Sequence, residues 1–282
     1  MNFQDIEKIK KTLARSGHIF EYQVCDLFEK NGWMIVPNRF YLDKDEDKGR
    51  EIDLVAYKIS EVKPETAVIT VVVVEAKQSL KNKWVFFTKG DYSGSINLNN
   101  YPLFYLNEIL ELETSYPDQE KFKGYLLNML QKNNLMGLFN FEYKAHSYAE
   151  VSEAKDSQKT TQSTFFNATN ASDIHGAIFP VIKAISSELA LYENRKIATN
   201  EKRFYWVFPL VVFNGEILEA RVKEGNIDLL EKDEIQYVTR YTSKRYDDFY
   251  SINVIRWQSL IKYINLYNQM HETLINQINA DI

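Results

Sequence analysis

Residues 67–79 read AVITVVVVEAKQS, a nearly unbroken run of β-branched residues that ends in Glu75 and Lys77. The run lacks the spacing of an amphipathic helix, and this pattern predicts a strand that is buried on both faces. Side chains two positions apart in a strand point to the same face. The carboxylate and the ammonium therefore project together from the last residues of a buried strand, where charges need a structural or chemical reason.

A partner strand is predicted just before this run, over Arg50 to Lys58, with the connecting turn at residues 59–65. In a hairpin centred near Pro64, Asp53 and Glu75 lie equally far from the centre, so they stand directly opposite each other with their Cβ atoms about 5 Å apart. Two carboxylates this close repel each other unless one is protonated or a cation lies between them. Because hard divalent ions take oxygen ligands, the pair predicts a site for Mg²⁺ or Mn²⁺.

A third carboxylate comes from a helical pattern over residues 16–32. Glu21 is the charged member of a stripe that otherwise holds small or apolar residues, namely Gly17, Val24 and Phe28. A carboxylate turned toward a core must be paired or bound to a metal, and a glycine one turn earlier allows close approach of the backbone. Glu21 is therefore a candidate metal ligand.

Each of these residues also has a purely structural interpretation. Glu75 and Lys77 could form an ordinary ion pair at a strand end, Asp53 could be a solvated residue at a strand start, and Glu21 could turn to solvent. For any residue alone this interpretation is preferred. Together, in a register that makes them meet, the residues favour the metal site.

The same residues carry a resemblance to a known family. Gly17-x-x-Phe20-Glu21 on a helix, Ile52-Asp53 in a strand and Glu75-Ala76-Lys77 at the end of the next strand resemble the PD-(D/E)xK nuclease superfamily, in particular the Mrr-type restriction endonucleases. The resemblance covers residues Phe3 to Ser79. The proline of the family's name is absent before Asp53, where Ile52 stands.

This resemblance implies metal-dependent hydrolysis of phosphodiester bonds. Asp53, Glu75 and Glu21 would hold Mg²⁺ or Mn²⁺, and Lys77 would orient the water and steady charge on the phosphate. The implied protein is a DNA endonuclease of restriction or anti-phage defence type.

The expected fold is α/β, a restriction-endonuclease-like mixed sheet flanked by helices. The helix that carries Glu21 should cover one face, and a helix over residues 173–193 should cover the other. We expect one elaborated domain with a core at residues 1–79 and 170–215, a helical insertion at 80–169 and a C-terminal extension with extra strands at 216–282.

Further elements are expected along the chain. Pro102 and Pro117 are each expected to begin a helix, the first running to Thr114. The Asn214-Gly215 pair predicts a type I′ turn between two paired strands. The remaining expectations are a strand at 139–148, a polar loop at 150–170, strands at 235–241 and 249–255, and a terminal helix at 257–278.

Basic and aromatic residues alternate after the valine strand, in a segment expected to be a loop. Lys81, Lys83 and Lys89 are candidate nucleic-acid-binding residues there, with Trp84 and Phe86 between them. Such interleaving equally describes a packed loop, and the two interpretations stay open.

Composition restricts the class of protein. The chain has 282 residues and a formal net charge of -5, so any grip on nucleic acid must be local rather than due to total charge. The single cysteine, Cys25, excludes an internal disulfide and lies in an apolar helical pattern. The four histidines lack zinc-ligand spacing. Without a long apolar run, the protein is expected to be soluble and cytoplasmic, with no membrane contact.

Two rival functions remain open at this stage. The chain could be a nuclease-fold subunit that acts only inside a larger assembly, with a protein partner or a second copy of itself. It could also be a non-catalytic binding protein that kept the fold. The complete set of Asp53, Glu75 and Lys77 argues against the second rival.

Overall fold

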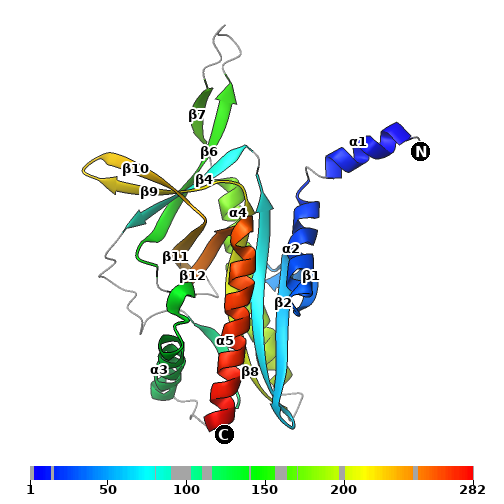
Figure 1. The fold of residues 1–282 in the computed structure, drawn as a ribbon, viewed down its shortest axis with the longest axis vertical. Helices are drawn as coiled ribbons and strands as arrows, with labels where there is room; N and C mark the ends of the chain where they lie inside the picture. Colours follow the sequence, from blue (N-terminus) through cyan, green and yellow to red (C-terminus); the bar gives the residue numbers. More distant parts are fainter. Residues whose placement is uncertain are drawn as a thin grey trace.

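A mixed sheet runs through the whole molecule and helices cover both of its faces (Figure 1). The computed structural model describes residues 3–13, 16–79, 81–89, 103–109, 116–139, 141–155, 164–169, 171–196, 201–243 and 247–281. The helices are α1 (Phe3–Leu13), α2 (His18–Lys30), α3 (Tyr116–Lys132), α4 (Ser172–Lys196) and α5 (Leu260–Asp281), with short 3-10 turns at Met136–Leu138 and Trp257–Ser259.

Within the described residues the sheet has 12 strands. They are β1 (Met34–Asp43), β2 (Lys48–Lys63), β3 (Thr66–Gln78), β4 (Asn82–Lys89), β5 (Phe104–Asn107), β6 (Lys144–Lys155), β7 (Thr164–Thr169), β8 (Lys202–Asn214), β9 (Ile217–Lys223), β10 (Asn226–Lys232), β11 (Glu234–Thr242) and β12 (Asp247–Arg256). The spatial order is β1-β2-β3-β8-β12-β11-β6-β4-β9-β10, with β5 on β8 and β7 on β6. The α/β class and the mixed sheet flanked by helices are therefore confirmed.

The predicted hairpin of β2 and β3 has the predicted register. Leu54 pairs with Val74, and the ladder continues without a slip to Glu61 opposite Ala67. The turn predicted at residues 59–65 is shorter, because β2 continues to Lys63 and only Pro64 and Glu65 form the turn, where Glu65 has a positive φ of 61°. On its other side β3 pairs in parallel with β8, and this places the valine run between two strands.

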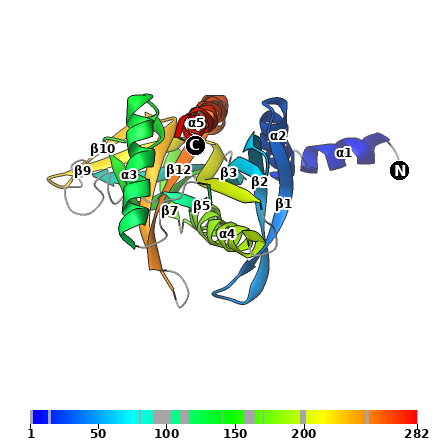
Figure 2. The same ribbon diagram turned by 90° about the horizontal axis from the view of Figure 1, so that it is seen from below.

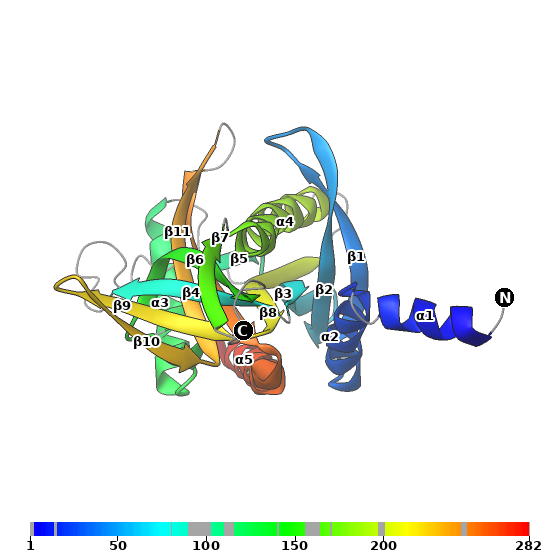
Figure 3. The same cartoon turned by 90° about the horizontal axis from the view of Figure 1, so that it is seen from above.

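Two apolar layers lie on the two faces of the sheet. Figure 3 shows α4 on one face and α2 and α5 on the other. Alternate residues of β3 serve the two layers: Val72 and Val74 pack with the layer of α2 and α5, whereas Val71 and Val73 pack with the layer of α4. Figure 2 shows α3 on the same side as α5, and Leu126 and Leu130 of α3 belong to that layer. The predicted placement of a helix on each face is confirmed.

Helix α4 is the one described helix that is long and apolar enough to span a membrane. Ile178, Val181, Ile182 and Ile185 are nevertheless fully buried against the sheet. A core helix of a soluble protein has this pattern, because its apolar side is covered by protein rather than by lipid.

The predicted pairing of residues 204–213 with residues 216–222 is wrong. β9 does not return along β8 but pairs in parallel with β4 and antiparallel with β10. Gly215 does not have the positive φ that a type I′ turn needs. Such a turn occurs instead between β9 and β10, where Glu224 and Gly225 have φ values of 53° and 81°.

Three predicted segments differ from the structure between residues 81 and 170. The segment with alternating lysines is a strand, β4, whose Trp84 and Phe86 are buried in the α4 layer. Residues 104–107 form β5 rather than a helix, and the rest of the predicted helix at 102–114 has only residues 103, 108 and 109 within the described part. The expected polar loop contains the end of β6 and the antiparallel strand β7, while its residues 156–163 lie outside the described part.

Other predicted elements are present. Helix α3 begins next to Pro117, α4 begins at Ser172, and β11, β12 and α5 occupy the predicted positions. The strand predicted at 139–148 begins later, at Lys144. Cys25 is a free and buried thiol, as its apolar pattern predicted.

Candidate functional site

Two charged side chains lie at the end of the central strand β3. Glu75 pairs in register with Val211 of β8, and Lys77 with Phe213, so both project from a region of apolar neighbours. Glu75 is only 4% exposed. The Lys77 ammonium nitrogen lies 2.5 Å from Glu75 Oε1. The predicted projection of the two side chains from one strand end thus produces a direct ion pair.

Asp53 lies at the point where the ladder between β2 and β3 stops. Its carboxylate oxygen Oδ2 accepts a hydrogen bond from the Ala76 backbone N–H at 2.8 Å. Leu54 opposite Val74 is the last ladder pair at this end. The side chain of Asp53 therefore supplies an acceptor to the backbone of the strand that carries Glu75 and Lys77.

The alternation of β2 changes at Asp53. Ile52 and Val55 both pack in the α4 layer although they are three positions apart, and Leu54 packs in the opposite layer. In a regular strand, residues on one face are an even number apart. On the neighbouring strand β1, Asn38 has a φ of 47° in the left-handed region. The strands thus bend where the site begins, as strands do at irregularities beside functional sites.

Glu21 reaches the site from α2, the helix on the opposite layer. Gly17 caps that helix with a φ of 86°, and His18 Nδ1 lies 3.2 Å from Glu21 Oε2. The negative charge on Glu21 raises the pKa of Asp53 and of Lys77, which shows that it acts on both groups. The structure therefore brings Glu21 near Asp53, although its side-chain partner among the described residues is His18.

The surroundings raise the pKa of both carboxylates above its usual value. Burial and then the charge on Asp53 raise the pKa of Glu75 from 4.5 to about 8. Burial is also the largest cause of the raised pKa of Asp53. Burial alone would lower the pKa of Lys77, but the charges on Glu75 and Asp53 outweigh it and raise the pKa. The site holds more negative charge than one lysine neutralises.

Two buried oxygens beside the site have no hydrogen-bond partner among the described residues. They are Glu75 Oε2 and the hydroxyl of Tyr41, a side chain of β1. The charges on Asp43 and Glu75 both raise the pKa of Tyr41, after the larger effect of burial. A buried carboxylate oxygen without a partner costs free energy, and a divalent cation or a proton would relieve that cost.

The donors present fit Mg²⁺ or Mn²⁺, because Asp53 and Glu75 offer only carboxylate oxygens. Among the described residues, however, no group of three or more His, Cys, Asp or Glu side chains is arranged to hold a metal ion. The fit therefore involves a pair of carboxylates, with Glu21 nearby, rather than a closed set of three ligands.

The three lysines predicted to bind nucleic acid do not meet. Lys83 forms an ion pair with Glu216, and Lys81 lies just before β4. Lys89 stands six residues along β4 from Lys83, about 20 Å away in a strand. Lys81 and Lys83 line an open polar cleft of about 260 Å³ that also includes Ser79 and Asn214, directly after the strand end that carries Lys77.

Sequence reasoning missed Tyr41 and His18 as neighbours of the site. The pairing of β1 with β2 would have placed Tyr41 opposite Arg50, but the bend at Asn38 decides which face the tyrosine takes. His18 lies one helical turn before Glu21, and that spacing was a signal in the sequence.

Comparisons of the chain with protein-family models, with curated proteins and with solved structures found no match.

Proposed function

We propose that this protein is a metal-dependent nuclease that hydrolyses phosphodiester bonds, with DNA cut internally as its substrate. The observation that carries the proposal is Glu75, a buried carboxylate with one oxygen on Lys77 and the other without a partner among the described residues. Asp53 adds a second negative charge that acts on the same group. Buried like charges beside a lysine at a strand end are the arrangement that a phosphate-cleaving metal site needs.

Each residue has a defined role in this proposal. Asp53 and Glu75 would hold Mg²⁺ or Mn²⁺, and Glu21 would support the ion from α2. The ion would supply a Lewis acid and an activated water. Lys77, held beside Glu75, would orient the water and balance charge on the phosphate. The polar cleft after Ser79 has Lys81 and Lys83 on its wall. A strand of the DNA substrate would reach this end of the sheet through that cleft.

A restriction-endonuclease-like fold, a cytoplasmic location and a role in restriction or defence against phage belong to the same proposal. The support is the order of Glu21 on a helix, Asp53 in a strand and Glu75 and Lys77 at the end of the next strand. The mixed sheet with helices on both faces is compatible with that fold.

The test is a nuclease assay on supercoiled and linear DNA, single-stranded DNA and RNA, each with Mg²⁺, Mn²⁺ or EDTA. We expect internal cleavage of DNA that needs the metal and stops in EDTA. Absence of cleavage on all substrates with both metals would contradict the proposal for the isolated chain.

One observation favours a second candidate, a non-catalytic protein or a subunit that is active only with a partner. Lys77 contacts Glu75 directly, and a contact of this kind also occurs in an ordinary buried ion pair. Metal binding separates the two candidates, because a structural ion pair has no need for a divalent ion. Metal binding without cleavage would point to a subunit that needs its partner.

A further inference from the structure

A second cleft, lined by charged and aromatic side chains, lies on the α4 face at the tip of the hairpin between β1 and β2. It has a volume of about 140 Å³. We call it the α4 cleft; its wall includes Tyr41, Glu46, Arg50, His175, Phe179 and Lys183. Figure 3 shows this hairpin reaching toward α4. None of these residues belongs to the pair of carboxylates that would hold the metal ion.

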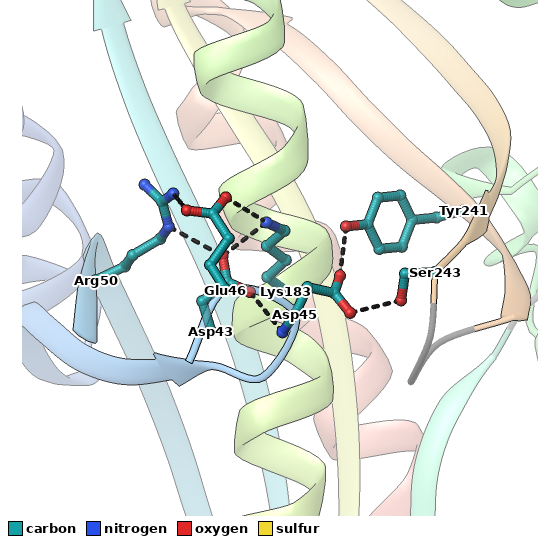
Figure 4. Close-up of polar contacts among 7 residues, drawn as sticks. All are labelled: Asp43, Asp45, Glu46, Arg50, Lys183, Tyr241 and Ser243. Atoms are coloured by element: carbon teal, nitrogen blue, oxygen red, sulfur yellow. Dashed lines mark hydrogen bonds and ion pairs between the residues drawn. The ribbon is translucent and has the colours of Figure 1, made fainter. Parts of the chain in front are cut away.

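Two cations in the α4 cleft are fixed by one buried carboxylate. Asp43 is 0% exposed, and its Oδ2 accepts hydrogen bonds from Arg50 Nε at 2.9 Å and from Lys183 Nζ at 2.6 Å (Figure 4). These bonds lower the pKa of Asp43 against the opposite effect of burial, so it stays ionised. The guanidinium and the ammonium are thus held in place side by side.

Glu46 occupies the outer side of the same two cations. Its Oε2 lies 2.5 Å from Arg50 and its Oε1 lies 3.5 Å from Lys183 (Figure 4). The Glu46 side chain is 49% exposed, whereas the Lys183 side chain is 12% exposed. An exposed carboxylate can move into water at little cost, but the buried Asp43 cannot. Glu46 is therefore the displaceable anion of this cluster.

The charge balance specifies what could replace it. Arg50 and Lys183 carry two positive charges and Asp43 carries one negative charge, so one positive charge remains when Glu46 leaves. A phosphodiester group carries a single negative charge, and Arg and Lys side chains bind phosphate oxygens well. The Asp45 carboxylate does not contact these two cations, since it accepts hydrogen bonds from Tyr241 and Ser243 (Figure 4).

Two more features of the α4 cleft fit a nucleotide. The Tyr41 hydroxyl, on a residue that is 3% exposed, has no hydrogen-bond partner among the described residues. It is a donor just beneath the cleft wall that no described residue engages. The rings of His175 and Phe179 lie 4.2 Å apart at the rim and present a surface on which a base or sugar can pack.

We propose that the α4 cleft is a phosphate subsite for nucleic acid, in which Arg50 and Lys183 bind a phosphodiester group in place of Glu46. The nucleic-acid identity of the ligand rests on the proposed nuclease function, while the subsite itself rests on the geometry of the cleft. Glu46 is then a built-in competitor of the phosphate.

The experiment measures binding of a short fluorescein-labelled DNA duplex in EDTA by fluorescence anisotropy, so that no metal-dependent cleavage occurs. Glu46→Gln removes the competing charge and should tighten binding about threefold to tenfold. Glu51→Gln is the matched control. Glu51 is exposed on the same hairpin, and its substitution removes the same charge at a position outside the cluster. The effect of Glu51→Gln on DNA binding should be smaller. Inorganic phosphate should displace DNA more effectively from the Glu46→Gln variant than from the parent.

Removal of a cation from the α4 cleft should weaken DNA binding, the opposite of the effect of Glu46→Gln. Lys183→Gln should weaken DNA binding about tenfold, whereas Lys48→Gln on the exposed tip of the hairpin should weaken it less. Should Lys183→Gln fail to fold, Arg50→Gln serves instead, because Arg50 is more exposed. The Glu46→Gln arm needs no change in the core.

The outcomes separate the two proposals. Equal effects of Glu46→Gln and Glu51→Gln, or no binding by the parent and by Glu46→Gln, overturn the subsite, whether or not the protein cleaves DNA. A specific effect of Glu46→Gln in a protein without nuclease activity supports the subsite and contradicts the proposed function.

Discussion

The Asp53 carboxylate oxygen Oδ2 accepts a hydrogen bond from the Ala76 backbone nitrogen at 2.8 Å. A side chain of β2 therefore fixes the strand end that carries Glu75 and Lys77. This bond gives Asp53 a structural role besides its proposed role at the metal. Replacement by alanine removes both the ligand and an acceptor, whereas asparagine keeps an acceptor oxygen in the same place. The variants below therefore use asparagine at this position.

Lys77→Ala should reduce single-turnover cleavage of DNA by at least about a hundredfold, because the lysine would balance charge on the phosphate. Metal binding, measured by calorimetry with Mn²⁺, should persist, since the ammonium is not a ligand. Lys63→Ala is the control and should cleave at the parental rate, because Lys63 is exposed at the opposite end of the hairpin of β2 and β3. Cleavage by Lys77→Ala at the parental rate would refute the role.

Asp53→Asn combined with Glu75→Gln should melt at a higher temperature than the parent in EDTA. Measured above pH 8, where Glu75 is ionised, the double change keeps the shape of both side chains and removes a buried and a half-buried negative charge that repel each other. Millimolar Mg²⁺ or Mn²⁺ should raise the melting temperature of the parent. The corresponding gain in free energy of unfolding is about 2.7 kcal/mol at a hundredfold excess of the ion over its dissociation constant. The double variant should not respond. Equal melting of both proteins with and without metal would argue for a non-catalytic protein.

The contribution of Glu75 to the stability of the metal-free protein should fall as the pH rises from about 4.5 to about 8. The pKa of Glu75 is raised in the folded state from 4.5 to about 8, so the folded state binds this proton more tightly than the unfolded state does. The resulting stabilisation is present below the unfolded pKa and is lost as the pH rises through the folded value, with roughly 5 kcal/mol as its upper limit. Urea unfolding in EDTA across this range measures it. Glu75→Gln should flatten the profile, and an unchanged slope in that variant would assign the effect to another group.

His271 should cause the opposite trend in acid. It is buried in α5, with Nδ1 2.8 Å from Thr70 Oγ1 and Nε2 3.0 Å from Ser60 Oγ. Burial, assisted by the charge on Lys58, lowers its pKa from 6.5 to about 4. The contribution of neutral His271 to stability is therefore complete above pH 6.5 and decreases by about 3 kcal/mol as the pH falls toward 4.

Unfolding of His271→Gln in urea checks this origin of the acid sensitivity. The variant should be less stable than the parent at neutral pH, because its hydrogen bonds to Thr70 and Ser60 are altered. It should lose less stability between pH 6.5 and pH 4 than the parent. An acid decrease as large as that of the parent would contradict the assignment.

Gly215→Ala should destabilise the protein by about 1–3 kcal/mol through overpacking. A Cβ at Gly215 would lie 2.3 Å from Cζ of the buried Phe213 ring and 2.9 Å from the Ser79 carbonyl oxygen. Gly124→Ala in α3 is the control, since nothing lies within 4 Å of the added atom and alanine favours a helix. Thermal melting should show opposite signs for the two variants, and equal melting temperatures would mean that the close approach at Gly215 relaxes freely.

The hairpin of β2 and β3 could be predicted from sequence because local symmetry about Pro64 sets its register. The helices on the two faces could be predicted for a similar reason, since each has its own apolar stripe. Pairing between distant strands could not be predicted: Asn214-Gly215 is a strong local turn signal, but β9 finds β4 as its partner instead. The position of Tyr41 beside the site also depends on a bend in β1, and no single residue of the sequence predicts that bend.

The pairing of β3 with β8 has a consequence for the synthesis of the protein. Thr66 pairs with Lys202, 136 positions later in the chain, and the same separation holds to Gln78 opposite Asn214. A contact this distant requires a large loop to close, and topologies of this kind fold slowly. A growing chain cannot complete the strand that carries Glu75 and Lys77 until β8 has left the ribosome. The proposed cutting activity would thus arise only after β8 has been synthesised and has paired with β3.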